Sequence, residues 1–404
     1  MGQANVRQTA SQHTAVQREH LLWVLSAATF LIFFQAYMVA PLIPRLAEVF
    51  GVPIERVGLI VPAYLIPYGV STLLYGLLSD RVGRRSIMFA SLAAFILLTG
   101  ITGFVNSSAQ MITLRLLTGL GASGVVPLAL ALIGDLFPYR ERGRPLGWLF
   151  GAMAGGMAVG STLGVILEPL ITWRGLFFGV ALLGLISLFA LLPYRGLLDE
   201  TGERQARPLR AIINGYTALI STTRGARTYS YVLLNAVFHS GVFTWLGLYF
   251  SRRYGLGEIG IGLALLGYGI PGFLLGPVIG RLADKYGRSR LIPVGLMLAG
   301  MSAAALALDL PVIAAALLVT LLSLGYDLTQ PLLAGIVTDL GPQRGQAMGL
   351  NVFTLFVGFG TGSILFSAAL RSGFGAALLI FGAVALLAGL VAFPFFYSES
   401  HATK

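Results

Sequence analysis

The sequence predicts an all-α integral membrane protein with twelve transmembrane helices in two six-helix, pseudo-symmetric halves. The first observation is composition: 56% of the 404 residues are hydrophobic and 11% are charged, whereas about 25% of residues are charged in soluble domains. The second is the number of apolar runs, since about 20 apolar residues cross a bilayer as a helix. The third is an internal repeat, in which matching residues lie 204 positions apart, as Asp80 and Asp284 do.

The apolar runs divide the chain into two halves, a linker and two tails. The parts are a polar N-terminal tail at 1–20, the N-terminal half at 21–195, a polar linker at 196–226, the C-terminal half at 227–397 and a short tail at 398–404. The predicted spans are 21–43, 54–79, 86–105, 109–134, 145–168, 173–195, 227–250, 258–282, 289–308, 311–337, 346–369 and 374–397. The two-residue alternation of an outer-membrane barrel is absent, so helices remain as the way to satisfy the backbone in lipid. The polar start and the long first run predict a span and no cleavable signal peptide.

The distribution of basic residues predicts the orientation. The net charge is +11, and of the 27 Lys and Arg residues, six fall in predicted extracytoplasmic segments and Arg115 lies within a span, so the rest fall in predicted cytoplasmic segments. This asymmetry places both termini in the cytoplasm. No basic stripe is interleaved with exposed aromatic residues, so we expect no nucleic-acid partner. The chain has no cysteine, which excludes disulfides and thiolate-bound metals, and we expect neither a metal nor a cofactor.

The strongest motif is a charged hairpin of the form G-x-L-x-D-[RK]-x-G-R, which occurs in both halves. One copy runs from Gly76 to Arg84 and the other from Gly280 to Arg288. This duplicated hairpin resembles the loop between the second and third helices in the major facilitator superfamily of secondary transporters, and the resemblance covers nearly the whole chain. It implies a multi-pass monomer in the inner cell membrane, with substrate bound between the halves near mid-membrane.

The resemblance also implies a cytoplasmic latch that holds the halves together in the outward-open state and must break for inward opening. In the first half, Asp80 would meet the start of the eleventh span near 345–349, because N-terminal helix amides attract an anion, and Arg84 would reach Asp135. The second half would form the equivalent set. The latch residues are Gly76, Asp80, Arg81, Gly83, Arg84, Asp135, Gly280, Asp284, Gly287, Arg288 and Asp339. The alternative is a hairpin that only sets topology.

Arg115 places a full charge in the apolar fourth span. A buried Arg is costly unless it is paired or hydrated, so it is a functional candidate. The pattern R-x-x-x-G-x-G, with Gly119 and Gly121, resembles the fourth-helix motif of proton-coupled members, which implies a link to proton transfer. Snorkelling toward the outer headgroups is the alternative, because the residue is not far from that surface.

Glycines recur along the fifth span, at Gly151, Gly155, Gly160 and Gly164. Glycines four residues apart let a neighbouring backbone approach closely, so we expect helix packing here. The spacing G-x8-G-x3-G at Gly151, Gly160 and Gly164 resembles the antiporter motif of the drug/proton exporters. That motif continues Pro-x-x-Gly-Gly, whereas Val165 to Pro169 follow here, and packing alone would need only the glycines.

Four ionisable groups at membrane depth are candidates for proton coupling: Arg115, Glu168, His239 and Asp327. A desolvated carboxylate such as Asp327 suits reversible protonation, and its i, i+3 spacing places Gln330 on the same helix face. The alternatives are an Asp paired with a hydroxyl, a hydrogen-bonded core His and a Glu168 in the wet outer loop.

The first span carries no acid, although many drug exporters have one there. Gln35 takes a central place in it and cannot titrate, so the proton site must lie elsewhere or be missing. His239 is the repeat partner of Gln35 and titrates in a useful range. We therefore expect these two side chains to face each other across the cavity.

Aromatic and amide side chains within the spans predict the substrate site. A phosphate ester would need central Arg or Lys pairs, which are absent, so a mostly apolar, neutral or cationic substrate fits better. The lining candidates are Gln35, Tyr37, Tyr64, Tyr68, Asn235, His239, Trp245, Tyr268, Tyr326, Gln330 and Asn351. Each of them could equally serve in packing.

The leading interpretation is a secondary transporter that works by alternating access and exports small amphipathic or drug-like compounds in exchange for protons. The alternative is a sugar or metabolite porter, importer or facilitator, which the missing first-span acid and the incomplete antiporter motif favour. A membrane enzyme is not expected, because no G-x-S-x-G serine accompanies His239. A receptor or scaffold would not need two intact hairpins. The expected partners are a small-molecule substrate, protons and the lipid bilayer.

Overall fold

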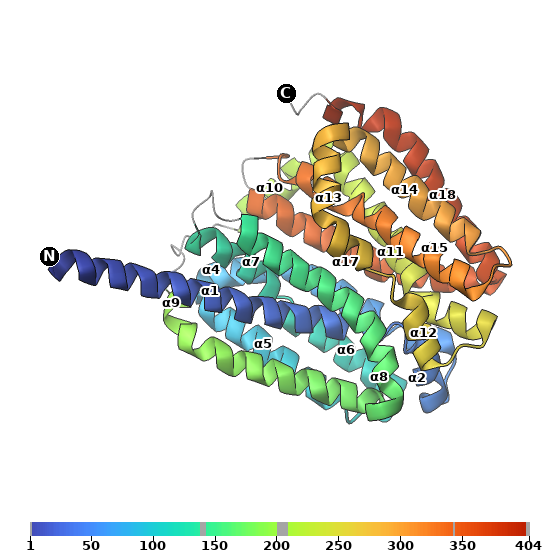
Figure 1. The fold of residues 1–404 in the computed structure, drawn as a ribbon, viewed down its shortest axis with the longest axis horizontal. Coiled ribbons are helices and arrows are strands. Elements are labelled where there is room, and N and C mark those ends of the chain that lie inside the picture. The colour runs from blue at the N-terminus through green and yellow to red at the C-terminus, as the bar shows by residue number, and fades with distance from the viewer. Residues whose placement is uncertain (1, 138–142, 200–208, 342–343, 401–404) are drawn as a thin grey trace.

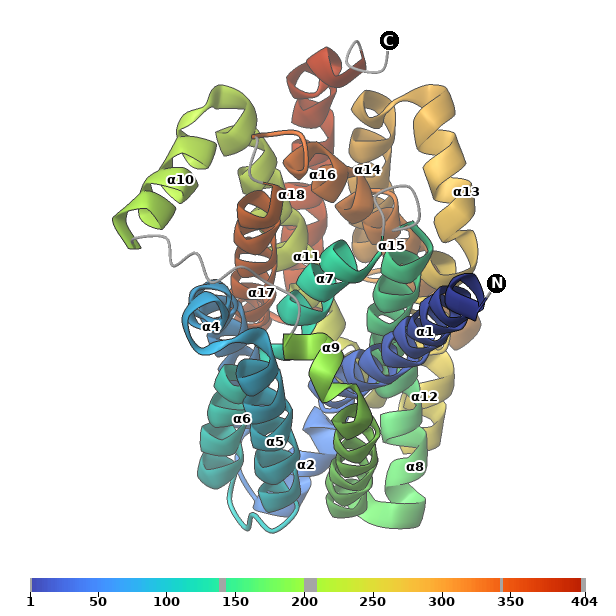
Figure 2. The same ribbon diagram turned by 90° about the vertical axis from the view of Figure 1, so that its left-hand side faces the viewer.

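The chain folds into two helical bundles that lie side by side (Figure 1). The computed structural model describes residues 2–137, 143–199, 209–341 and 344–400, and within these ranges all regular structure is helical. The first bundle runs from blue to green and the second from yellow to red, and the N-terminal part of α1 extends beyond its bundle. Figure 2 looks onto the end that carries α9 and α10, with the C-terminal bundle above the N-terminal one.

The N-terminal half is built from long helices joined by short breaks. Its helices are α1 (Gly2–Tyr37), α2 (Ile43–Phe50), α3 (Ile54–Gly58), α4 (Pro62–Val82), α5 (Arg84–Thr102), α6 (Ser108–Ala122), α7 (Val125–Leu136), α8 (Gly143–Leu191), η2 (Leu192–Tyr194) and α9 (Arg195–Asp199). The residues of the predicted N-terminal tail from Gly2 onward continue the helix of the first span, and their place in the cytoplasm stays a prediction. α8 covers two predicted spans and breaks at Thr172, where φ is 60°.

The linker and the C-terminal half follow the same plan. Their helices are α10 (Leu209–Ser221), α11 (Thr223–Tyr254), α12 (Glu258–Leu265), α13 (Ile270–Tyr286), α14 (Arg288–Ala305), α15 (Val312–Asp327), α16 (Gln330–Val337), α17 (Arg344–Ala369), η3 (Leu370–Ser372), α18 (Phe374–Phe395) and η4 (Tyr397–Ser400). Linker residues 200–208 and tail residues 401–404 lie outside the described residues. The seventh span starts earlier than predicted, because the Thr222 hydroxyl caps α11 by accepting from the Gly225 amide.

Helices occupy all twelve predicted spans. Among the described residues, nine helices are long and apolar enough to cross a membrane, and one of them, Arg144–Leu198, covers the fifth and sixth predicted spans together. The eighth span is divided between α12 and α13, which keeps each part short. The all-helical membrane architecture is confirmed, and the count of twelve crossings stays a prediction.

The internal repeat is present in the backbone. Gly51 and Gly255 end their helices with φ of 60° and 65°, and Gly83 and Gly287 begin the next helices with φ of 102° and 81°. These left-handed conformations favour glycine, because a Cβ would be strained there. The repeat seen in the sequence therefore preserves local geometry as well as residue type.

Prolines break the fourth and tenth spans at equivalent places. Pro127 and Pro331 lie in the first turns of α7 and α16, and a proline ring clashes with the carbonyl four residues earlier, which ends the preceding helix. The expected helix face that joins Asp327 to Gln330 is therefore wrong: α15 ends at Asp327 and a new helix begins at Gln330.

The halves touch at the end that the sequence assigns to the outside. A Cβ at Gly58 would overlap the Trp245 ring, and a Cβ at Gly247 would lie 2.9 Å from the Pro41 Cα. α8 also packs against α12, and α17 against α4. We call the surface formed by Pro41, Gly58, Trp245 and Gly247 the outer interface, after the predicted orientation. In this structure it closes that end of the molecule.

Candidate functional site

Aromatic rings from both halves fill the space between the bundles. Tyr64 stacks on Tyr68 with a centroid distance of 5.8 Å, and Tyr68 stacks on Phe356 of the other half at 4.4 Å. Tyr37 meets Phe243 of the other half at 5.8 Å. We call this group the central cluster; its members are Tyr37, Tyr64, Tyr68, His239, Phe243, Tyr268, Tyr326, Phe356 and Phe359.

Several polar atoms in and beside the central cluster are buried without a hydrogen-bond partner among the described residues. They are Gln35 Nε2, the hydroxyls of Tyr37, Tyr64 and Tyr68, His239 Nδ1 and Asn351 Oδ1. An orphaned buried polar group is costly, so such a group needs an explanation. Donors and acceptors that converge between rings suit an amphipathic ligand that brings its own polar groups.

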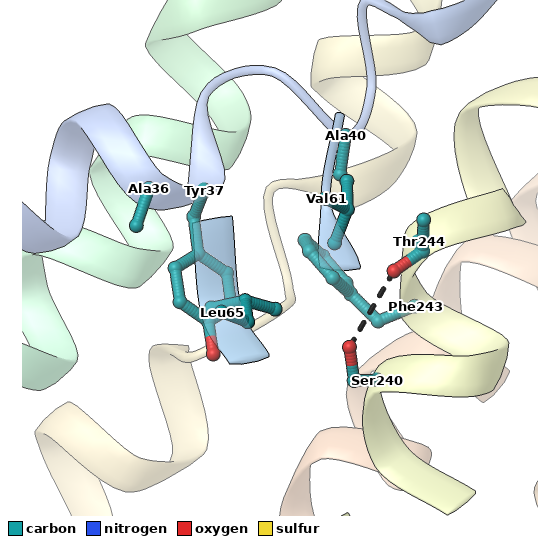
Figure 3. A pocket seen from close by; sticks show the side chains of 8 residues that line it. All are labelled: Ala36, Tyr37, Ala40, Val61, Leu65, Ser240, Phe243 and Thr244. Carbon is teal, nitrogen blue, oxygen red and sulfur yellow. Dashed lines mark hydrogen bonds between the residues drawn. The ribbon is translucent and has the colours of Figure 1, made fainter. Parts of the chain in front are cut away.

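A small cavity lies on the boundary between the halves (Figure 3). Tyr37 and Leu65 line it from the N-terminal half, and Ser240, Phe243 and Thr244 line it from α11. Its volume is about 10 Å³, about the least that holds one water molecule. This cavity therefore has room for about one water molecule and not for a substrate.

Arg115 is fully buried and is held by the ends of two other spans. Its Nε donates to the Ile60 carbonyl at 3.2 Å, Nη1 to the Gln35 side-chain oxygen at 2.7 Å and Nη2 to the Ala36 carbonyl at 3.1 Å. Its guanidinium also lies 4.2 Å from the centre of the Tyr64 ring. With 0% of its surface exposed, this side chain does not snorkel.

The acceptors of Arg115 explain its position. The Ala36 and Gln35 carbonyls belong to the last turn of α1, which has no amides ahead to bond them, and a cation there also meets the negative end of the helix dipole. The Ile60 carbonyl lies in the break between α3 and α4. Arg115 therefore stabilises two helix interruptions at once.

The glycines of the Arg115 motif bring α6 against its neighbours. A Cβ at Gly119 would overlap the Tyr64 carbonyl, and a Cβ at Gly121 would lie 2.9 Å from the Ala94 side chain. The pattern R-x-x-x-G-x-G therefore has a packing explanation in this chain, beside the proton link that the resemblance implies.

Asp327 is the acid at the centre of the C-terminal half. Its Oδ2 accepts a long hydrogen bond of 3.5 Å from the Ser323 hydroxyl, and its carboxylate lies against Gly272, where a Cβ would be 2.6 Å from Oδ1. Tyr268 and Tyr326 lie close enough to interact with it electrostatically. Pairing of Asp327 with a hydroxyl is the alternative to a role in proton coupling. The structure contains that hydroxyl, and it also places aromatic rings around the carboxylate.

His239 lies within the central cluster. Its ring stacks on Tyr326 at a centroid distance of 3.7 Å, and its Nε2 is hydrogen-bonded to the Tyr268 hydroxyl. The expectation that His239 and Gln35 face each other is not met, because the Gln35 side chain is turned to Arg115 within its own half. Each of the two polar groups is held by its own repeat.

The remaining predicted lining residues divide between the site and the outer interface. Asn235 donates to the Gln330 side-chain oxygen at 3.3 Å, and both are buried. Trp245 instead packs on Gly58 in the outer interface, and its indole N–H donates to the Ser363 carbonyl at 3.1 Å. We therefore correct the prediction for Trp245 from lining to interface packing.

Glu168 is not in a wet loop. Only 4% of its surface is exposed, and its carboxylate lies 3.3 Å from Arg45 Nε. The same Arg45 nitrogen is 4.0 Å from Glu258, which belongs to the other half. The three side chains therefore connect the halves next to the outer interface.

The predicted latch is described in part. The side chains of Asp80, Asp135 and Asp284 and the surroundings of Gly76 and Gly280 are not among the described parts of the structure. Arg81 is exposed on the last turn of α4 and Arg84 is half-buried at the start of α5. In the second half, Arg288 Nη1 lies 3.5 Å from Asp339 Oδ2.

The glycines of α8 contact α1, with a shift from the predicted set. A Cβ at Gly160 would lie 2.5 Å from the Phe34 carbonyl oxygen, and one at Gly164 would lie 2.7 Å from the Met38 side chain. Gly156 takes part in the same way, against the Phe30 carbonyl, whereas Gly155 only reaches ordinary contact and Gly151 meets no atom within 4 Å. The expected packing role is therefore wrong for Gly151.

The phenylalanines of the central cluster were not predicted. Phe243 follows Asn235 and His239 at intervals of four on α11, so helical spacing could have placed it on the same face. Phe356 and Phe359 carry no such signal, because a phenylalanine in an apolar span faces lipid as readily as a neighbour.

Comparison with known proteins decides the family. The family model of the Major Facilitator Superfamily matches residues 25–343 and 254–404. The chain belongs to the major facilitator superfamily. Its curated relatives include proteins named for drug resistance and for efflux, as the resemblance to the drug/proton antiporters predicts.

Two relatives match this superfamily member over most of their length. The uncharacterised MFS-type transporter YceJ of Bacillus subtilis (strain 168) is 28% identical over 349 residues, which are 85% of this chain and 87% of YceJ. The chloramphenicol resistance protein of Streptomyces lividans is 26% identical over 381 residues, which are 93% and 95% of the two chains.

Solved structures share the fold. The human organic anion transporter MFSD10 aligns with a TM-score of 0.73 at 18% identity, over 93% of this chain and 99% of its own. A POT family transporter aligns with a TM-score of 0.77 at 15% identity, over 94% and 96%. At these identities the likeness is one of fold.

Proposed function

We propose that this superfamily transporter exports small amphipathic compounds in exchange for protons, by alternating access to the central cluster. The observation that carries the proposal is Asp327, a carboxylate held beside the central cluster. Asp327 is half-buried; among the described residues of the spans, the fully buried acid is Glu168, which is paired with Arg45 next to the outer interface. Asp327 is therefore the better candidate for a proton that enters and leaves near the substrate.

The surroundings of Asp327 fit an amphipathic substrate. Aromatic rings supply apolar contact from both halves, and the orphaned polar atoms supply hydrogen bonds. The N–H donors of Arg115 are bonded to the Ile60 and Ala36 carbonyls, so its guanidinium does not offer a free site for an anion. Relatives named for chloramphenicol and multidrug resistance support the same class of substrate.

The test is transport by the purified protein in liposomes. With an acidic lumen, we expect uptake of radiolabelled chloramphenicol to accelerate and the lumen to lose protons, as a trapped pH dye would report. Asp327→Asn should remove the response to the pH gradient, whereas Asp309→Asn, a change in an exposed loop acid, should keep it. If chloramphenicol uptake by the wild type does not respond to the pH gradient, the protein is a facilitator and not an antiporter. If glucose is taken up and chloramphenicol is not, the sugar porter is favoured.

We also propose that both termini lie in the cytoplasm and that the protein is a monomer in the inner cell membrane. The excess of basic residues in the linker and hairpins supports this orientation. In a chain without cysteines, Ser86→Cys should react with a membrane-impermeant thiol reagent only from the cytoplasmic side, and Ser251→Cys only from outside. Labelling of Ser251→Cys from the inside alone would reverse the assignment.

The hairpins are proposed to latch the cytoplasmic ends of the halves in the outward-open state. The shared backbone geometry at Gly83 and Gly287 and the Arg288–Asp339 pair support a built structure rather than a loose positive loop. Asp80→Asn should slow turnover strongly while leaving substrate affinity nearly intact, because the charge is lost from a state-specific contact. Wild-type turnover in that variant would contradict the latch.

A further inference from the structure

The two repeats differ in one stretch beside Asp327. In the first half, the break between α3 and α4 comes earlier, at 59–61, and α4 then runs on from Pro62 to Val82 through Pro67. In the second half, the helix stops at Leu265 and restarts at Ile270, with Gly269 at a φ of 79°. The segment Gly267–Gly272 carries glycine at three positions where the first repeat has Ala63, Leu65 and Tyr68.

The break lets a helix N-terminus reach Asp327. Gly272 lies in the first turn of α13, where backbone amides have no partner within the helix. A Cβ at Gly272 would lie 2.6 Å from Asp327 Oδ1, so a larger residue would push the carboxylate away. Because Gly272 has no Cβ, the carboxylate can lie directly against the first turn of α13.

Ser323 connects the same carboxylate to the break. The Gly269 amide donates to the Ser323 hydroxyl at 2.9 Å, and this hydroxyl donates to Asp327 Oδ2 at 3.5 Å. The repeat equivalents of Ser323 and Asp327 are Gly119 and Ser123, which cannot make this arrangement. The acid and its hydroxyl partner therefore occur in one half only, and they lie beside the later of the two helix breaks.

We propose that Ser323 and Gly272 are positioning residues that hold the ionised Asp327 against the N-terminus of α13, and that proton binding releases this helix end. The inference rests on the proposed role of Asp327 in proton exchange. Donors and the positive end of a helix dipole favour the charged carboxylate, and a protonated one loses most of that attraction. Proton binding at Asp327 therefore changes the position of α13.

The released helix end would transmit the change to the other half. α13 packs against α8, and a Cβ at Gly269 would lie 2.6 Å from the Ala158 Cβ of α8. The titratable groups that face Asp327 are Tyr268 and Tyr326, and His239 of α11 contacts both rings. These neighbours are aromatic groups, so among the described residues the Ser323 hydroxyl and the first turn of α13 are the direct partners of the charge.

Hydrogen–deuterium exchange of the full-length protein in detergent tests this without any substrate. Segment 267–272 is compared with its repeat counterpart 63–68, which corrects for the intrinsic effect of pH on exchange. We expect the ratio of the two rates to fall as the pH rises and Asp327 ionises. Asp327→Asn should make the ratio independent of pH.

The positioning residues should move the midpoint of this transition. Ser323→Ala should shift it to higher pH by roughly 0.5–1 unit, which is a three- to tenfold change in proton affinity. Ser323→Thr keeps a hydroxyl and should restore the wild-type midpoint, and Ser302→Ala, which removes a buried hydroxyl bonded to a helix carbonyl elsewhere, should leave it unchanged. In the Asp327→Asn background, Ser323→Ala should add no further effect.

Two outcomes separate this inference from the proposed function. If Asp327→Asn retains pH-driven chloramphenicol transport but loses the pH-dependent exchange, the proposed function fails and the positioning role stands. If the variant loses pH-driven transport while the exchange ratio still responds to pH, the positioning role fails. A wild-type ratio that does not change with pH, or a Ser323→Ala midpoint equal to that of the wild type, also overturns it.

Discussion

Replacing Arg115 by methionine should destabilise the N-terminal half strongly. Methionine is similar in length and apolar, so it fills the space but provides no donor. The change leaves the acceptors of Arg115 at Ile60, Gln35 and Ala36 without their buried partner. The comparison isolates the polar contacts of a side chain that has no exposed surface.

The size of the effect follows from these contacts. The groups left behind are four neutral acceptor oxygens. An orphaned buried acceptor costs about 1–3 kcal/mol, and the sum is reduced because the guanidinium no longer has to be desolvated. We therefore expect a loss of about 3–5 kcal/mol. For 404 residues and an unfolding entropy of about 2.1 cal/mol/K per residue, this corresponds to a fall in Tm of about 4–6 °C.

Thermal unfolding in detergent, followed by tryptophan fluorescence, measures the shift. Arg115→Lys is the matched control, because lysine keeps the charge but offers a single point donor in place of the planar fork, so about half of the loss should remain. A fall of less than about 1 °C for Arg115→Met would refute the reasoning. If both variants unfold early but keep pH-driven transport, Arg115 stabilises the fold and takes no part in proton transfer.

Three further perturbations test the packing and the ion pairs. Gly160→Ala should lower the free energy of unfolding by about 1–3 kcal/mol, because its Cβ would overlap backbone atoms of α1. Gly151→Ala should change it by no more than about 0.5 kcal/mol. Urea or thermal unfolding of the two variants measures the difference. Burial alone would raise the pKa of the Glu399 carboxyl, but the hydrogen bonds from two arginines outweigh it and hold that pKa below its ordinary value. The ionised Glu399 therefore stabilises the folded protein above pH ~4.3. This stabilisation is lost as the pH falls through the lowered pKa. The Tm difference between wild type and Glu399→Gln should therefore shrink below about pH 4, and a constant difference would contradict the pairing. Arg45→Gln removes a partly exposed ion pair between the halves, which is worth up to about 1 kcal/mol. The outer interface should then open more often. A Thr244→Cys reporter beneath it should be labelled from outside up to about fivefold faster.

The sequence predicted the parts of the fold that depend on the repeat and on composition. The 204-residue offset matched Gly51 with Gly255 and Gly83 with Gly287, and all four adopt left-handed backbone conformations. Composition placed a helix in each predicted span. Both signals are local, since one depends on residue type at a turn and the other on the length of an apolar run.

The contacts of the site were harder to predict because the spans are apolar on all sides. In a soluble helix the polar face shows which side is exposed, but in lipid both lipid-facing and buried sides are apolar. The sequence therefore identified Arg115 and His239 as unusual without showing that each is held within its own half. It also could not separate Trp245, which packs in the outer interface, from the tyrosines of the central cluster.

The two halves share a backbone plan but differ in the chemistry at equivalent positions. In the first half, Arg115 and Gln35 are tied to helix ends by hydrogen bonds that do not depend on pH near neutrality, because an arginine stays protonated there. In the second half, the positions equivalent to Gln35 and Ser123 carry His239 and Asp327, and Asp327 is the group that we propose to bind the proton. Tyr64 and its repeat partner Tyr268 lie beside the basic group in each case.

This asymmetry suits a transporter of two rocking halves. Under the proposed function, the fixed charge of Arg115 would keep the first half constant, while Asp327 would give the second half two states that differ by one proton. Gly269 of the segment before α13 packs on α8 of the first half. A change in the position of α13 would therefore alter a contact between the two halves. One half that binds a proton and one half that does not would be sufficient to couple proton binding to transport. A proton bound in one half shifts the equilibrium between the two arrangements of both halves.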